Sequence, residues 1–427
     1  MEAPNLAMIP SGVKATKLYS IMPENGVGDF TFDRNLNTAY RLNKDGLWEL
    51  VAEDVPRLHY DLTNGKPDSC PCLLLEPAST NILGYSETFS SWGQTRSAIT
   101  SNSLTSPDGT VNASKMADDG STGTDTSQRF LSVTVEEDED YHFSVFAKKG
   151  SMDFIALRTG DFTDGVGIGE TFFNLATGAV GTTYANHTAS IEKYPNDWYR
   201  CIIKFTSGTD LSGTLLIRQA SANGTSTVPL DGNSFVYLWG AQFEKTTSSK
   251  RASSYIKSDS NSQTTRSAET CNSAGDANTF NSEEGILFAE IQALADDGTN
   301  RRIELTDGTS SNRIGIGLTT VANQIKYFLI VGGASQVNLN VTISNTLQYN
   351  KIAFKYKAND FELYVNGSSV STDTSGSVSA ANTLNVLDFS SLGSTNVLYG
   401  KVKDIRYYDT EGMTDTEINN LLTQLTQ

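Results

Sequence analysis

The chain has 427 residues, with 32 Lys and Arg against 49 Asp and Glu, so its formal net charge is −17. This balance argues against a nucleic-acid binder, because phosphate neutralisation needs clustered basic residues. No apolar run approaches the ~20 residues of a membrane helix, the N-terminus lacks a secretory pattern, and four cysteines do not make a disulfide scaffold.

Short apolar stretches alternate with turn residues along most of the chain, which predicts an all-β protein. Residues 1–27 show little periodicity and are interpreted as an arm. Residues 39–51 form two strand-like pieces around an Asp-Gly turn, typical of a tight hairpin. The apolar side chains of this region are Phe30, Phe32, Tyr40, Leu47 and Trp48. A short hairpin cannot bury so many alone, so we expect residues 1–80 to be buried against sister subunits or a larger particle.

The clearest predicted strands are residues 141–147, 198–205 and 235–244, in which side chains alternate between two faces. Their expected core faces consist of Tyr141, Phe143, Val145 and Ala147; of Tyr199, Cys201, Ile203 and Phe205; and of Phe235, Tyr237, Trp239, Ala241 and Phe243. Trp198 points away from its core face and is expected at an inter-domain or inter-subunit contact. Residues 245–267 are rich in Ser and Thr and are predicted to be a linker between two β domains.

A second β region follows, with a predicted hairpin from residues 351–357 and 361–367. The chain ends in one predicted helix, whose first turn (414–417) has the pattern of a capping box. Its apolar stripe is formed by Ile418, Leu421, Leu422 and Leu425. Because a short helix is stable only when packed, we expect it to dock on the second β domain or on a neighbouring subunit.

These segments together carry a family resemblance. The stretch DFTFDRNLNTAYRLNKDGLWELVAEDVPRLHYD (29–61), followed by residues 72–93, resembles the head of a bacteriophage virion-protein module, in which a hairpin motif precedes a carbohydrate-binding-type jelly roll. NDWYRCIIKF (196–205) and FVYLWGAQFEK (235–245) are similar to the close of that jelly roll. The last region, from EGILFAEI to KVKDIRYYDTEGMTDTEINNLL, resembles a concanavalin-A-like or laminin-G-like domain.

The resemblance implies two tandem β-sandwiches and three regions. Residues 1–80 would serve attachment and oligomerisation, residues 81–262 would form the jelly roll, and residues 263–427 the concanavalin-A-like or laminin-G-like sandwich with its C-terminal helix. Such modules occur in tail fibres, head fibres and capsid spikes. The expected role is therefore attachment to a host-surface glycan from the virion surface, after assembly in the host cytoplasm.

The expected partners follow from the same resemblance. The chain is expected to bind itself, as a homotrimer or, on a five-fold capsid vertex, as a pentamer. Its N-terminal region would bind a capsid or tail protein, whereas no nucleic acid and no membrane insertion are expected. Two alternatives stay open: an architectural head fibre or decoration protein without a ligand, and a polysaccharide depolymerase. We expect no enzyme, because there is no G-x-S-x-G elbow and no motif singles out a pair of catalytic carboxylates.

Sugar recognition needs an aromatic face beside polar groups, and three residues are candidates. Trp92 lies in a loop-like segment, where it could also pack beneath the sandwich, while Tyr184 and His187 share one polar loop. No cofactor is expected. Cys70-Pro71-Cys72 lacks the second pair of ligands that a zinc site needs. The acidic run 136–140 is typical of a solvated turn, with a structural calcium as the alternative.

Overall fold

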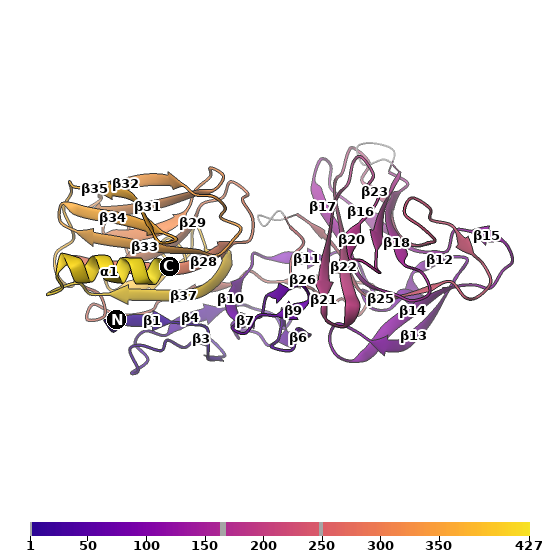
Figure 1. The fold of residues 1–427 in the computed structure, drawn as a ribbon, viewed down its shortest axis with the longest axis horizontal. Coiled ribbons are helices and arrows are strands. Elements are labelled where there is room, and N and C mark those ends of the chain that lie inside the picture. The colour runs from indigo at the N-terminus through magenta and orange to yellow at the C-terminus, as the bar shows by residue number, and fades with distance from the viewer. Residues whose placement is uncertain (1, 163–167, 247–250) are drawn as a thin grey trace.

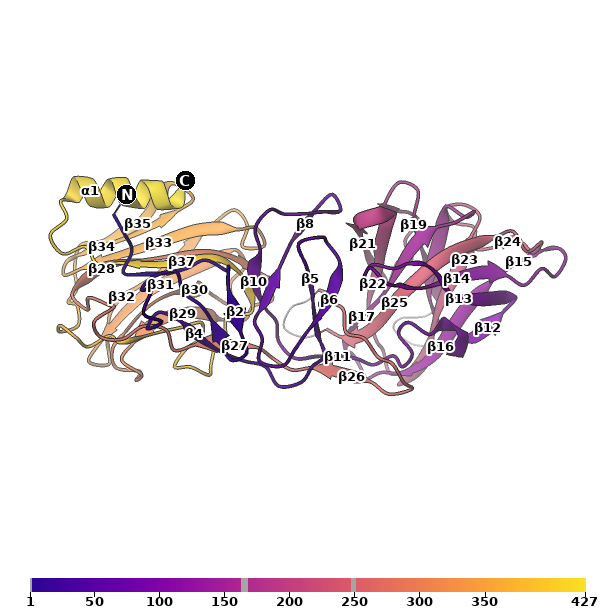
Figure 2. The ribbon, with the colours of Figure 1, turned by 90° about the horizontal axis from the view of Figure 1, so that it is seen from below.

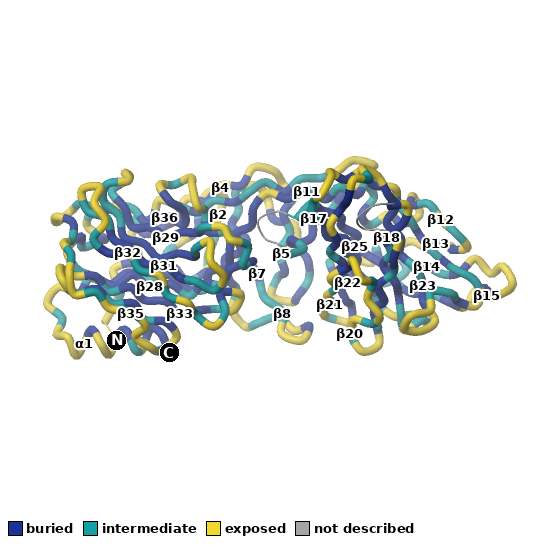
Figure 3. Tube along the Cα trace, turned by 90° about the horizontal axis from the view of Figure 1, so that it is seen from above, coloured by how far each residue is buried: buried dark blue, intermediate teal, exposed yellow. Residues whose placement is uncertain are grey.

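The computed structural model describes residues 2–162, 168–246 and 251–427. Figure 1 shows an elongated molecule in which two β lobes flank an N-terminal segment. The lobes are two β-sandwiches, as the sequence predicts. Their strands are buried along most of their length, while exposed residues gather at the loops (Figure 3). The core therefore consists of separate apolar clusters, one within each lobe and smaller ones outside them.

The jelly roll consists of two antiparallel six-stranded sheets. The first has the order β12 (Gly93–Thr95), β16 (Gln128–Thr134), β23 (Ser212–Ala220), β18 (Phe154–Gly160), β19 (Gly169–Asn174) and β20 (Ala179–Val180). The second has the order β13 (Ser97–Thr105), β14 (Val111–Asp118), β25 (Phe235–Lys245), β17 (Asp140–Lys149), β22 (Trp198–Thr206) and β21 (Thr188–Tyr194). The predicted core faces of β17 and β22 lie between the sheets, which confirms their alternation. A small pair, β15 (Thr124–Asp125) and β24 (Val228–Pro229), lies at the outer end of this lobe (Figure 1).

The predicted core face of β25 is partly wrong. The register between β17 and β25 shifts after Ser144, and Gly240 has a left-handed φ of 58°. This β-bulge inverts the alternation of side chains. Before it, Val236 and Leu238 face the jelly-roll core; after it, Ala241 and Phe243 do. Tyr237 and Trp239 therefore pack on the opposite side of the strand.

The C-terminal sandwich combines three sheets. The largest has the order β35 (Ser368–Asp373), β34 (Asp360–Val365), β33 (Asn350–Lys357), β28 (Glu284–Ala293), β37 (Gly400–Tyr408), β10 (Cys72–Leu75) and β7 (Arg57–His59), with β1 (Leu6–Met8) also on β37. Opposite lies β32 (Ala334–Thr342), β31 (Gln324–Val331), β30 (Arg313–Leu318), β29 (Arg301–Thr306) and β36 (Val386–Asp388). The third contains β2 (Val13–Lys14), β3 (Lys17–Leu18), β4 (Phe30–Asp33) and β27 (Thr270–Asn272). The predicted hairpin is confirmed as β33 and β34.

The N-terminal segment is part of the C-terminal sandwich rather than an arm. β1 aligns Leu6 with Tyr407 of β37, and β10 aligns Leu73 with Val402 along the same edge. Phe30 and Phe32 are buried in that lobe's core, where the Phe30 ring lies 4.6 Å from the ring of Phe389. Burial of these side chains therefore needs no sister subunit, and that reason for expecting one is wrong.

The predicted hairpin of residues 39–51 is confirmed as β5 (Ala39–Leu42) and β6 (Trp48–Val51), and it leans on the jelly roll (Figure 2). Trp48 packs with Trp198, Trp239 and Tyr255 in an aromatic cluster on the outer face of the second jelly-roll sheet. The Trp198 indole also donates a hydrogen bond to the Thr105 carbonyl at 3.1 Å. Trp198 is thus at a contact between two parts of one chain.

Most of the described part of the predicted linker is buried or half-buried, and its exposed residues are 259–263. Tyr255 and Ile256 are fully buried, and β26 (Thr264–Arg266) pairs with β11 (Ser79–Asn81). Residues 247–250 lie outside the described ranges. Because Ser and Thr supply hydrogen-bonding groups to a polar interior, their abundance here marks a junction between lobes and not a free tether.

Helix α1 (Asp415–Thr426) begins with the predicted capping box, in which the Thr414 hydroxyl accepts from the Glu417 N–H and the Glu417 carboxylate accepts from the Thr414 N–H. Its stripe of Ile418, Leu421, Leu422 and Leu425 packs on the outer face of the largest sheet, beside Ile286 and Phe288. The helix therefore docks on the second β lobe. Within the described ranges, no helix has the length and apolar character needed to span a bilayer.

Candidate functional site

A cleft of about 870 Å³ lies where the two lobes and the N-terminal segment meet. We call it the interlobe cleft. The N-terminal segment supplies residues 42–76, including the small hairpin β8 (Leu62–Thr63) and β9 (Lys66–Pro67). The jelly roll supplies the wall with Glu192 and Lys193, and the C-terminal sandwich supplies Gln292, Gln348, Tyr349, Lys401 and Lys403. Most of these groups are polar, which suits a hydrated ligand rich in hydroxyls.

Asp61 is the central acidic group of the cleft. Its carboxylate accepts a hydrogen bond from the Tyr349 hydroxyl at 2.7 Å and forms an ion pair with Lys401. Burial alone would raise the pKa of Asp61, but Lys401, His59 and the Tyr349 hydroxyl together hold it below its usual value. Asp61 is therefore an ionised acceptor that fixes Tyr349 and Lys401 at the sandwich wall.

His59 lies beside Asp61 as a neutral ring. Its Nδ1 accepts a hydrogen bond from the Leu42 N–H at 3.2 Å, so the proton of the neutral ring is on Nε2, 3.6 Å from Asp61 Oδ1. Burial, and then the charge of Lys401, lowers the pKa of His59 to about 3. In this neutral ring Nε2 carries the proton and the lone pair of Nδ1 already accepts a hydrogen bond, so no lone pair is free to act as a general base.

The sandwich wall also presents an amphipathic surface. Lys403 Nζ lies 4.0 Å from the centre of the Tyr349 ring and 3.7 Å from Asp68 Oδ2. Neighbouring Cys72 is buried, its Sγ contacts the His59 carbonyl at 3.4 Å, and burial raises the pKa of its thiol to about 12. The thiol is therefore no nucleophile at neutral pH.

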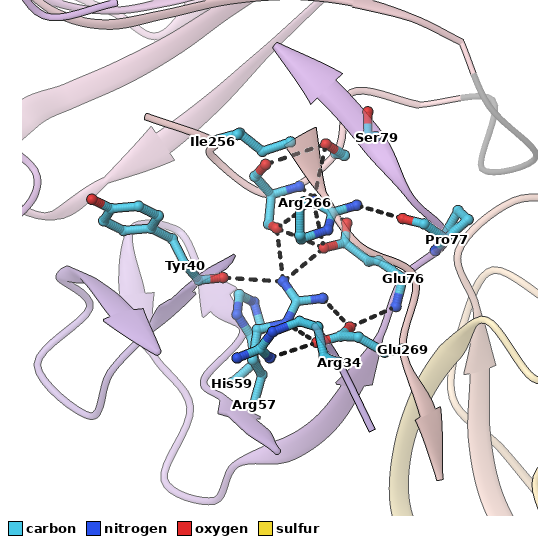
Figure 4. Close-up of polar contacts among 12 residues, drawn as sticks. Arg34, Tyr40, Arg57, His59, Glu76, Pro77, Ser79, Ile256, Arg266 and Glu269 are labelled. Atoms are coloured by element: carbon cyan, nitrogen blue, oxygen red, sulfur yellow. Dashed lines mark hydrogen bonds and ion pairs between the residues drawn. The ribbon is translucent and has the colours of Figure 1, made fainter. Parts of the chain in front are cut away.

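Behind the cleft floor lies a buried charge network of Arg34, Arg57, Arg266, Glu76 and Glu269 (Figure 4). All three guanidinium groups are inaccessible to solvent. Glu269 accepts from Arg34 Nη1 at 2.9 Å, from Arg57 Nε at 2.7 Å and from the Glu76 N–H at 2.9 Å. The network thus ties together residues from the N-terminal segment and from the junction between lobes.

Glu76 connects this network to the cleft surface. Its carboxylate accepts from Arg57 at 2.8 Å and from both the hydroxyl and the N–H of Ser254, at 2.6 and 3.0 Å. Burial opposes its ionisation, but Arg266 and Arg57 hold the pKa of Glu76 well below its usual value. Next to it, Arg200 donates to the Ser253 carbonyl at 2.8 Å. The floor is therefore pre-organised and already charge-compensated.

Trp92 lies elsewhere and is buried. Only 3% of it is exposed, its ring centre is 5.3 Å from that of Phe89, and its indole donates to the Tyr85 carbonyl at 3.1 Å. This is the alternative packing that the sequence allowed. An enclosed indole offers no face on which a sugar could stack.

Tyr184 and His187 are neighbours, as the sequence suggests, with ring centres 5.2 Å apart. His187 is buried between the hydroxyls of Thr159 and Thr171, at 3.0 and 2.9 Å, and burial lowers its pKa to about 4. Tyr184 is half-buried, and its ring covers the backbone of Gly169. They lie beyond β20, at the opposite edge of the first jelly-roll sheet from Trp92, which precedes β12, so the three candidates do not form one site.

Sequence reasoning missed the interlobe cleft. Its side chains come from six separate stretches of chain, and each looks ordinary alone. The strongest local signal is Arg57–His59 followed by Asp61, where cationic, aromatic and acidic groups lie close together in the sequence. Among the described residues, no group of three or more His, Cys, Asp or Glu side chains is arranged to hold a metal ion.

The chain matches no protein-family model and no curated protein. Its fold is similar to parts of several solved structures. Sheep galectin-11 in complex with glycerol is 10% identical, with 30% of this chain and 86% of that chain covered and a TM-score of 0.20. Domains LG4-5 of the mouse laminin α1 chain are 9% identical, with 65% and 84% covered and a TM-score of 0.23. The LG1-3 region of the laminin α2 chain is 10% identical, with 67% and 65% covered and a TM-score of 0.25.

Proposed function

We propose that this chain is a bacteriophage surface appendage, a spike or fibre, that attaches to host-surface glycan through the interlobe cleft. The observation that carries the binding role is the cleft itself, a preformed hollow of about 870 Å³ lined by donors, acceptors and the half-buried ring of Tyr349. Sugar recognition uses such convergent polar groups beside an aromatic surface, whereas an apolar ligand would need a pocket lined mainly by hydrophobic side chains. The phage assignment rests on the sequence resemblance.

The charge state of the cleft supports binding without catalysis. A glycosidase needs an acid whose pKa is raised, opposite a second carboxylate. Among the carboxylates that line the cleft, Asp61 and Glu76 have pKa values that are shifted downward. His59 and Cys72 are likewise unsuited as base and nucleophile. Several copies per particle, as a trimer or pentamer, would turn weak single-site affinity into firm attachment.

The test compares two double variants of the full chain. Lys193→Ala with Gln348→Ala removes two exposed groups from opposite walls of the cleft, and Lys14→Ala with Gln424→Ala removes two exposed groups outside it. Each lost sugar contact is worth about 1 kcal/mol, so the cleft variant, which loses two, should bind host-surface polysaccharide about thirtyfold more weakly, while the control binds as the parent does.

Equal binding by both variants would reject the cleft as the site. New reducing ends or unsaturated sugars after incubation with host polysaccharide would reject the non-enzymatic proposal. Labelling of intact particles with antibody against this chain, viewed by electron microscopy, should place it on the virion surface. Its absence there would overturn the appendage role while leaving glycan binding to be judged by the first assay.

A further inference from the structure

The outer side of the five-stranded sheet in the C-terminal sandwich carries a cationic face, formed by Arg302, Arg313 and Lys326 around the buried ring of Phe328. The strand register places all four on the side opposite the apolar core, since Ile303, Ile314 and Tyr327 point inward. The three cationic groups lie 5.3, 5.6 and 5.8 Å from the centre of the Phe328 ring. They therefore converge on one point of the sheet.

Two glycines of β30 make this convergence possible. A Cβ on Gly315 would lie 2.6 Å from the Phe328 ring, and a Cβ on Gly317 would lie 2.9 Å from both Cδ and Nη1 of Arg302. Without these side chains, the Phe328 ring and the Arg302 side chain lie flat on the strand. The Arg302 side chain therefore packs directly against the backbone of β30 at Gly317, beside the Phe328 ring.

The positive charge of the cationic face is only partly compensated. Glu304 is buried at one side and is engaged by Arg313 at 3.3 Å and by the Ser391 hydroxyl at 2.6 Å. Asp388 lies across from Glu304, where it accepts from the Ser273 N–H. In the described part of the chain, neither Arg302 nor Lys326 has an ion-pair partner. Arg302 is 9% exposed, and its Nη1 makes no hydrogen bond there.

Three converging cationic groups, two of them without an ion-pair partner among the described residues, form a site for an oxyanion, because a guanidinium presents donors in a geometry that matches carboxylate and sulfate. Burial, and then the charges of Arg302 and Arg313, lower the pKa of Lys326, in keeping with uncompensated positive charge. The chain as a whole carries a net charge of −17 and repels polyanions. Binding of an anion here would therefore be local and selective.

We propose that the cationic face is a second ligand site, separate from the interlobe cleft, that binds the carboxylate or sulfate groups of an acidic polysaccharide. The polysaccharide source, rather than nucleic acid, is favoured because three cations on one sheet cannot neutralise the many phosphates on which nucleic-acid affinity depends. The inference goes beyond the proposed function, since it concerns a different lobe and a different chemistry.

The test measures binding of the full chain to oligogalacturonate and to dextran sulfate, with neutral dextran as the reference. Lys326→Glu should lower affinity for at least one acidic glycan by about tenfold or more, and Lys326→Arg should retain it. Lys14→Glu makes the same charge change at an exposed position of the third sheet and should bind as the parent does. Binding should weaken as salt rises, because the contact is Coulombic.

The two acidic probes separate the sources: preference for oligogalacturonate assigns a carboxylated sugar, and preference for dextran sulfate a sulfated one. Equal affinity of Lys326→Glu and Lys14→Glu, or no binding above neutral dextran, would overturn the proposal. So would tighter binding of a single-stranded DNA oligonucleotide. The variant with Lys193→Ala and Gln348→Ala should keep its affinity for the acidic probe, so failure of the cleft and failure of the cationic face give different results.

Discussion

Acidification from pH 7 to pH 5 should destabilise the folded chain through its three histidines. His59, His142 and His187 are 7, 4 and 6% exposed. Burial lowers their pKa values to about 3, 4 and 4, while an unfolded histidine titrates near about 6.5. Below that value the unfolded chain takes up protons that the folded chain refuses. Stability is therefore highest above about pH 6.5 and falls as the pH drops.

The size of the effect at pH 5 depends little on the folded pKa values, because all three lie below 5. An unfolded histidine gains about 2 kcal/mol from protonation at that pH, and the three together about 6 kcal/mol. Asp61 and Glu76 add little in this window, whereas burial raises the pKa of Glu87, Asp388 and Asp404, so their protonation in the folded state offsets part of the loss. Asp61 and Glu76 have lowered pKa values, so they destabilise the fold only below about pH 4.5.

The measurement is urea unfolding at pH 7, 6 and 5, for the parent chain and for His187→Gln. The variant removes one titrating group, so its loss of stability between pH 7 and 5 should be smaller by about 2 kcal/mol. Asn420→Gln, at an exposed helix position, is the control and should lose as much as the parent. A parent loss under about 1 kcal/mol, or an identical loss in His187→Gln, would refute the reasoning.

Three further predictions concern stability and reactivity. Glu269→Gln leaves buried arginines uncompensated and should lower the free energy of unfolding by about 3–5 kcal/mol in a denaturation experiment. Leu422→Ala empties a fully buried position of α1 and should cost about 2–5 kcal/mol, against a near-neutral Asn420→Ala; equal effects would contradict the docked helix. A thiol reagent should label Cys70 in the native protein and leave Cys72 unmodified until unfolding, because only Cys70 is exposed; mass spectrometry reads the result.

The strands could be predicted because period-2 alternation is a local property of the sequence. It held in β17 and β22 and was inverted in β25 at Gly240, where one left-handed residue exchanges the two faces. A glycine inside a strand pattern is a signal for such a bulge. Because of this inversion, Trp239 packs in the aromatic cluster with Trp48 instead of in the jelly-roll core.

The N-terminal strands and the candidate site could not be predicted for a different reason. β1 has only three residues, which is too few to show period-2 alternation. Its partner strand lies about 400 residues away in the sequence. The cleft has the same origin: the pairing of β7 with β10, and of β10 with the distant β37, brings Asp61 to Tyr349 and Lys401. Loop aromatics such as Trp92 are easier to identify in a sequence than residues that meet only in the fold. Burial, however, decides whether an aromatic side chain can bind a ligand, and Trp92 is buried.

The pairing of β1 and β10 with β37 makes the jelly roll an insertion within the other lobe, and this fixes an order of events during synthesis. At about 5–20 residues per second, the ribosome needs roughly 20–80 s to reach β37 after making β1. During that interval the jelly roll can fold, while the backbone hydrogen-bonding groups of β1 and β10 that pair with β37 remain unpaired. Unpaired edges invite pairing with other chains. Sister chains made on the same message would therefore compete with β37 for these strands, so a chaperone that covers the open edges, or faster translation near the end of the message, should raise the yield of native protein.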